Sequence, residues 1–120
     1  MTLGQHQRLF TQLVGQLIAF AYSNGYELTF GDAYRDPRLA ALNAQQGKGI
    51  AKSLHSQRLA IDFNLFDAGL YMPKSESYKP LGEYWKTLHP LCCWGGDFKD
   101  RNGNPVPDGN HFSLTWGGVK

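Results

Sequence analysis

The first part of the chain carries apolar side chains at the spacing of a single helix face. They follow the i, i+3, i+4, i+7, i+8 pattern and are Phe10, Leu13, Val14, Leu17, Ile18 and Ala21. This pattern predicts an amphipathic helix over residues 3–23. The pair Asn24-Gly25 then supplies a typical helix end. We expect the apolar face of this helix to cover the core of the domain rather than to bind a partner.

Alternation of apolar and polar residues predicts three strands, over residues 26–31, 58–66 and 111–116. One face of the second strand is apolar and consists of Leu59, Ile61, Phe63 and Leu65. Successive strand residues point to opposite faces, so Asp62 belongs to the polar face of that strand. By the same reasoning, His111 lies on the polar face of the third strand, opposite Phe112.

Two further helices are expected, over residues 36–46 and 80–90. Asp36-Pro37 supplies a cap and a first-turn residue for the earlier helix, which we expect to end at Gly47. The remaining stretches are expected to be loops, over residues 47–54, 67–78 and 95–110. Because helices and strands do not alternate regularly, the pattern favours an α+β fold with a small antiparallel sheet packed against helices.

Composition and charge narrow the functional classes. The 120 residues are 42% hydrophobic and 18% charged, which suits one compact domain over residues 1–120. The net charge is only +2 and the basic residues are scattered, so we expect no nucleic-acid partner. No segment approaches about 20 apolar residues, so we expect no membrane span. Cys92 and Cys93 are sequence neighbours, and we expect two reduced thiols rather than a disulfide or a metal site.

Candidate chemistry gathers around two histidines. His55 and His111 each stand near an acid in a polar context, whereas His6 and His89 are expected to have structural roles. If the strands at 58–66 and 111–116 are antiparallel neighbours, Asp62 and His111 converge, and His55 can approach from the preceding loop. Two imidazoles and one carboxylate form a three-ligand catalytic zinc set with a fourth position open for water. Ordinary polar residues at strand ends are the competing interpretation.

Asp108 precedes His111 by three residues, in the turn Pro107-Asp108-Gly109. We expect this carboxylate to lie near the metal without binding it. Zinc lowers the pKa of bound water from 15.7 to about 7. A nearby carboxylate can accept the proton of that water and pass it to a leaving amine.

At these residues the sequence resembles the superfamily of zinc D-alanyl-D-alanine carboxypeptidases and phage L-alanyl-D-glutamate endopeptidases. The segment S-L-H-S-Q-R-L-A-I-D-F at 53–63 is similar to its first metal motif, and D-G-N-H-F at 108–112 to its second. A-Y-R-D-P at 33–37 is similar to the stretch that carries a substrate-binding arginine. L-G-E-Y-W-K at 81–86 and W-G-G-D-F-K at 94–99 resemble the branch used by phage endolysins. Arg58 departs from relatives, which often have glycine at this position.

The resemblance implies a role for each of these residues and a fold. It implies that the zinc ligands are His55, Asp62 and His111. It further implies that Asp108 is the catalytic acid/base and that Arg35 binds a substrate carboxylate or stabilises the oxyanion. The implied fold is hedgehog/D-Ala-D-Ala peptidase-like, with long loops framing a zinc cleft.

Two more residues are predicted to bind substrate. Ser53 is expected to line the cleft, with a loop-capping role as the alternative. Trp94 is a candidate to contact substrate, but a role in shaping the fold behind the site is favoured for it.

The implied activity is zinc-dependent cleavage of the peptidoglycan stem peptide, between L-Ala and D-Glu, by a phage or prophage endolysin. We expect a monomeric enzyme without a separate wall-binding domain. It is expected to be made in the host cytoplasm without a signal peptide and to reach the wall after release by another factor. The alternatives are a D-Ala-D-Ala carboxypeptidase or dipeptidase, and a non-catalytic zinc-containing wall-binding domain. A nucleic-acid binder is disfavoured because the sequence has no basic stripe. A metal-dependent nuclease that uses His111 stays an alternative, and it should have a basic surface near that residue.

Overall fold

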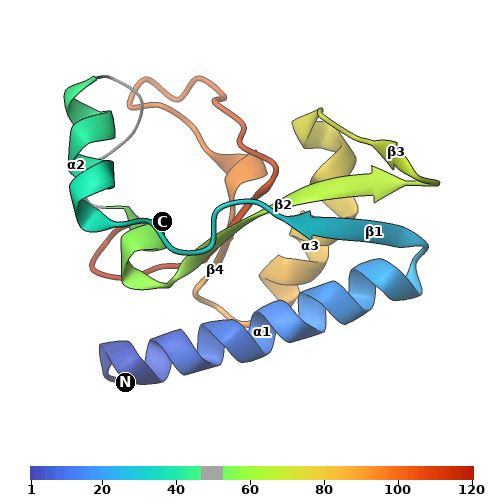
Figure 1. Ribbon diagram of the computed structural model, residues 1–120, viewed down its shortest axis with the longest axis horizontal. Coiled ribbons are helices and arrows are strands. Elements are labelled where there is room, and N and C mark those ends of the chain that lie inside the picture. The colour runs from blue at the N-terminus through green and yellow to red at the C-terminus, as the bar shows by residue number, and fades with distance from the viewer. Residues whose placement is uncertain (47–52) are drawn as a thin grey trace.

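The computed structural model describes residues 1–46 and 53–120 (Figure 1). In these ranges the helices are α1 (Leu3–Ser23), α2 (Pro37–Gln45) and α3 (Lys79–Leu88). The strands are β1 (Tyr26–Phe30), β2 (Ala60–Asp67), β3 (Leu70–Tyr71), β4 (Cys92–Trp94) and β5 (His111–Leu114). Short 3-10 turns are η1 (Leu54–Gln57), η2 (Ser75–Tyr78) and η3 (Gly95–Asp97). No helix in the described part of the chain is both long and apolar enough to cross a membrane.

Helix α1 has the bounds that its apolar pattern predicts. A capping box starts it, because the Thr2 hydroxyl accepts from the Gln5 N–H and the Gln5 side chain accepts from the Thr2 N–H. It ends before Asn24, and Gly25 follows at a φ of 83°. Gly15 lies in the middle of the helix, where glycine costs roughly 0.5–1 kcal/mol relative to alanine. A Cβ atom at Gly15 would meet no described atom within 4 Å, so crowding does not require glycine there.

The sheet is antiparallel throughout and has the order β1-β2-β5-β4, with β3 paired to β2. Figure 1 shows β1 and β3 on opposite sides of β2. Helices α1 and α3 pack against each other and against the sheet. Edge-to-face contacts of Phe10 with Trp85 and of Trp85 with Phe112 join α1, α3 and β5 into one core. The expected α+β fold with a small antiparallel sheet is confirmed.

The long stretches expected to be loops contain more structure than their sequence indicates. Residues 67–78 include β3 and η2, and η3 lies at the start of 95–110. Strand β4 was not predicted at all; it forms because Cys92 and Trp94 pair with Leu114 and Phe112 of β5. A strand of two or three residues is too short to show alternation, so only its long-range partner reveals it. Of the stretch 47–54, residues 47–52 lie outside the described residues.

Other element bounds shift by a few residues. The strand predicted over 111–116 ends at Leu114, and the helix predicted over 80–90 ends at Leu88. His89 is extended, as the residue before a proline prefers.

At the outer edge of the sheet, the Tyr22 hydroxyl contacts both the N–H of Leu28 at 3.2 Å and its carbonyl at 3.3 Å. This side chain therefore occupies backbone groups of β1 that another strand would otherwise pair with.

Candidate metal centre

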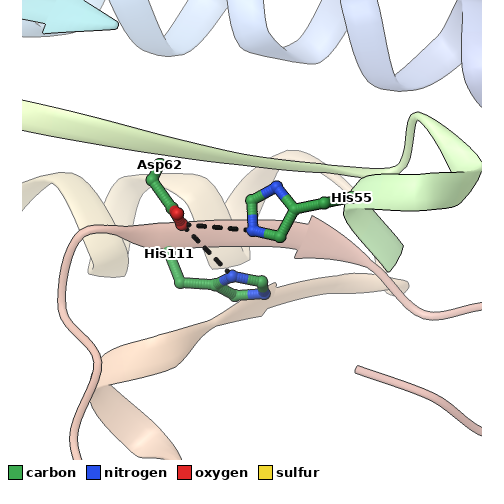
Figure 2. Close-up of side chains that lie close together, drawn as sticks. All are labelled: His55, Asp62 and His111. Atoms are coloured by element: carbon green, nitrogen blue, oxygen red, sulfur yellow. Dashed lines mark ion pairs between the residues drawn. The ribbon is translucent and has the colours of Figure 1, made fainter. Parts of the chain in front are cut away.

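Three side chains converge at the start of β2 and β5. The antiparallel register places Asp62 of β2 directly opposite His111 of β5. His55 comes from η1, the turn that precedes β2. Figure 2 shows both imidazoles directed at the Asp62 carboxylate, with His55 Nε2 and His111 Nδ1 each 3.4 Å from Oδ1. The predicted convergence of these three residues is present in the structure.

Local hydrogen bonds fix the position of His55. Ser53 caps η1, because its hydroxyl accepts from the His55 N–H at 3.1 Å. The His55 carbonyl in turn accepts from the N–H groups of Arg35 and Arg58, each at 3.3 Å. Arg58 closes the turn at a φ of 56°, a left-handed conformation that costs a non-glycine residue roughly 1 kcal/mol.

The backbone around Asp62 and His111 is held by close approaches of glycine. Gly31 donates to the Asp62 carbonyl at 2.8 Å, and a Cβ atom there would lie 3.1 Å from the same oxygen. A Cβ atom at Gly95 would collide with the Asp108 carbonyl and lie 2.8 Å from His111 Cβ. The Asp108 turn and the start of β5 can pack on η3 only because position 95 has no side chain.

The cluster is buried and its electrostatics favour an anionic carboxylate. His55 and His111 are 4% and 7% exposed. Burial by itself raises the pKa of Asp62, but the facing His111 and His55 rings outweigh it and lower that pKa to about 2. Within the described residues, Asp62 Oδ1 has no hydrogen-bond partner of good geometry. A buried carboxylate oxygen without such a partner is costly unless another group satisfies it.

The donor set fits a zinc ion. Imidazole nitrogen and carboxylate oxygen bind zinc at about 2.0–2.2 Å, so two tetrahedral ligand atoms lie about 3.4 Å apart. The two nitrogen-to-Oδ1 separations have this value, and one ligand atom from each residue lies within 4.8 Å of the others. Three protein ligands are also the number that leaves a catalytic zinc one open position.

Asp108 lies beside this cluster without joining it. Its N–H donates to the Gly95 carbonyl at 2.8 Å, and its carbonyl accepts from the His111 N–H at 3.0 Å. Partial burial raises the pKa of the Asp108 carboxyl; the negative charge of Asp62 adds to this effect, while the two histidines and Arg35 oppose it. A raised pKa brings a carboxyl closer to the range in which it can both accept and donate a proton.

Arg35 and Ser53 lie beside His55. One arm of the Arg35 guanidinium pairs with Asp32 at 3.1 Å and the other reaches the Ser53 hydroxyl at 3.5 Å. The sequence reasoning did not single out Asp32, because residues 31–36 form neither helix nor strand and no periodic pattern places this acid beside Arg35. The Asp32 carbonyl also accepts from the Asp62 N–H at 2.8 Å. Asp32 therefore links Arg35 to strand β2.

Trp94 has a clear structural contact. It is 6% exposed and its indole N–H donates to the Gly109 carbonyl at 2.7 Å. Its ring packs so closely on Gly82 and Gly96 that a Cβ atom at either position would collide with it. Trp94 therefore holds the turn that carries Asp108, and its contact with substrate stays a prediction.

The remaining histidines and the cysteines lie outside the cluster. The ring of His6 contacts the Thr2 carbonyl at 3.0 Å and packs edge-on against Trp116, and His89 accepts from the Leu91 N–H. Cys92 and Cys93 are free thiols. Sequence reasoning missed Phe98, whose ring packs 5.3 Å from that of His111, because nothing in its local pattern distinguishes it.

A solved peptidase structure shares this fold. The solved structure of the Serratia marcescens L-Ala D-Glu endopeptidase ChiX is similar, with a TM-score of 0.73 over 93% of this chain and 85% of that one. The sequence identity is 16%, so the likeness shows a shared fold. No curated protein gives a significant match.

The sequence comparison identifies the family. A family model described as D-alanyl-D-alanine carboxypeptidase matches residues 46–114. This span covers more than half of the chain and contains both metal motifs. The protein belongs to this family of peptidases, within the zinc peptidase superfamily that its motifs resemble.

Proposed function

We propose that this protein hydrolyses the stem peptide of bacterial peptidoglycan at the bond between L-Ala and D-Glu, with zinc held by His55, Asp62 and His111. The observation that carries the proposal is the buried Asp62 Oδ1 set between two imidazole nitrogens at 3.4 Å. Membership of a peptidase family supports the reaction class. The fold shared with an L-Ala D-Glu endopeptidase supports the choice of bond.

The residues around the cluster have distinct proposed roles. A bound zinc ion would supply Lewis-acid polarisation of the scissile carbonyl and would lower the pKa of water. The Asp108 carboxylate accepts the proton of the attacking water and donates it to the leaving amine. Arg35 binds a substrate carboxylate or the developing oxyanion, for which its fixed charge and forked donors are suited. Ser53 orients Arg35 and His55, and Trp94 supports the turn that carries Asp108.

A second activity deserves the same test, because the family description names D-alanyl-D-alanine carboxypeptidase. Such an enzyme releases a terminal residue and must recognise its free carboxylate. A non-catalytic wall-binding domain is less well supported, because a purely structural zinc site needs no unligated acid such as Asp108.

The biological setting is proposed from the sequence. The segments at 81–86 and 94–99 resemble phage endolysins, which supports a lytic role at the host wall after release by another factor. The Tyr22 hydroxyl on the edge of β1 supports a monomer, because it obstructs pairing of two sheets through that strand.

Digestion of purified peptidoglycan, followed by mass spectrometry of the products, tests the function. The cleavage products of wild-type protein are compared before chelation, after chelation and after zinc is restored. Asp62→Asn tests the site, and Asp67→Asn is the matched control, because Asp67 is exposed at the opposite end of β2. We expect cleavage by wild type and Asp67→Asn only with zinc, and about one zinc per chain in both.

The products decide between the alternatives. New D-Glu amino termini support the endopeptidase, whereas released D-Ala replaces it with the carboxypeptidase. Full activity of chelated protein or of Asp62→Asn contradicts the metal site. Bound zinc with no cleavage of any stem peptide supports the binding domain instead.

A further inference from the structure

An apolar pocket of about 510 Å³ opens between α1 and the sheet edge, away from the metal ligands. Its floor and walls are formed by side chains of α1, of the segment after β1 and of β2. The described lining residues include Phe10, Val14, Ile18, Phe30, Tyr34 and Ile61. This volume is in the range of small-molecule sites, which are mostly apolar with a few polar groups. Phe30 is 69% exposed at its rim, so a large apolar surface remains open.

Gly15 borders this pocket. It lies in the middle of α1, and a Cβ atom there would meet no described atom within 4 Å. A long side chain at this position therefore has room to occupy the pocket. Glycine weakens the helix here, and it leaves the space beside α1 unfilled.

Arg58 supplies the charge of the pocket. It is the only charged residue among the described residues that line it. Its guanidinium lies 4.2 Å from the centre of the Tyr34 ring, which holds it over the mouth of the pocket. No ion pair to Arg58 is found in the ranges 1–46 and 53–120, so its forked donors are available to an anion.

We propose that this pocket binds the alkyl chain of a small fatty acid, with the carboxylate paired to Arg58. The apolar walls match the chain, and the single cation at the mouth matches the charge of the headgroup. Arginine recognises carboxylates through two parallel hydrogen bonds.

This ligand would not occupy the metal site. Ala60 and Ile61 both line the pocket, whereas Asp62, the next residue of β2, faces the histidines. None of the three cluster residues lines the pocket, so the two sites are neighbours that share no residue. The proposal does not depend on peptidase activity, and its test measures binding alone.

Calorimetric titration of the full chain with octanoate tests the proposal, with octanol and hexanoate as comparison probes. We expect saturable 1:1 binding of octanoate, about tenfold or more tighter than that of hexanoate, because two more methylenes are buried. Binding should persist after chelation of the protein, which separates it from coordination of the carboxylate to zinc.

Two variants locate the site. Arg58→Gly suits the left-handed backbone and should weaken octanoate binding at least about tenfold while leaving octanol binding unchanged. Gly15→Leu should abolish binding of both probes. Its matched control, Gln16→Leu, adds the same side chain at the next, exposed helix position outside the pocket and should bind octanoate as wild type does.

Thermal unfolding of each variant confirms that it is folded. Absence of saturable octanoate binding to wild type would overturn the proposal. Octanoate binding of wild-type strength in folded Gly15→Leu would also overturn it. So would an equal loss of octanoate and octanol binding in Arg58→Gly, or the loss of octanoate binding when wild type is chelated.

Discussion

Two neighbouring regions, which we call the metal side and the pocket side, differ in how their chemistry is assembled. On the metal side, around Asp62, buried polar groups from η1, β2 and β5 converge on a single carboxylate oxygen. On the pocket side, around Ile61, an open apolar pocket has its walls on α1 and the sheet edge and is lined by one arginine. Adjacent residues of one strand thus belong to two unlike sites.

The comparison shows why the two sides should respond differently to mutation. The metal side depends on exact backbone approaches, such as that of Gly95 to the Asp108 carbonyl, because polar ligands must meet at fixed distances. The pocket side contains unfilled space at Gly15. Close-packed polar sites tolerate little displacement, whereas an open apolar surface accepts added atoms.

The largest effect is expected from removing the proposed proton-transfer group, the Asp108 carboxyl, on the metal side. Asp108→Asn should retain about one zinc per chain and lower kcat by about 100-fold or more, the scale of general acid–base catalysis. Zinc content and turnover of a stem-peptide substrate measure the two effects separately. Normal turnover in this variant would remove Asp108 from the proposed role.

Gly95→Ala should damage the metal side through the backbone. Its Cβ would collide with the Asp108 carbonyl and crowd His111, so we expect a loss of about 1–3 kcal/mol in the free energy of unfolding. Zinc affinity should fall as well, because His111 is displaced. Urea unfolding with and without zinc checks both effects, and unchanged stability would show that the Asp108 turn can move freely.

The metal-free protein should lose stability in acid because of Asp62. The pKa of this carboxyl is about 2 in the folded protein and 3.8 in its ordinary state, so the folded state favours the ionised form. Its contribution of about 2 kcal/mol is present above pH 3.8 and disappears as the pH falls toward 2. Urea unfolding midpoints across this range should fall more steeply for wild type than for Asp62→Asn, and parallel curves would contradict the shift.

The smallest effect, of opposite sign, is expected on the pocket side. Gly15→Ala should raise the free energy of unfolding by roughly 0.5–1 kcal/mol, because alanine favours the helix and its Cβ meets open space. Thermal unfolding of Gly15→Ala, Gly95→Ala and wild type under the same conditions compares the stability effects on the two sides directly. A destabilised Gly15→Ala would show that the pocket is less open than its contacts indicate.

Periodic segments were predicted well, and short or irregular ones were not. Helix α1 and the main part of β2 follow from residues that repeat over several turns or pleats. Strand β4 has three residues and depends on pairing with β5, so no local pattern could reveal it. The convergence of His55, Asp62 and His111 was predicted because their residue types and strand faces are visible in the sequence. The Asp32 link to Arg35 and the Phe98 contact with His111 required the folded chain.

Sequence alone determined which side chains are available: two histidines and one aspartate at strand ends, a nearby acid in a turn, and an amphipathic first helix. It determined this because side-chain direction alternates along a strand and rotates along a helix. Only the tertiary structure decided that Asp62 and His111 are partners in register and that Gly15 and Arg58 border one pocket. Such contacts join residues far apart in the chain, and their geometry depends on the packing of the whole domain.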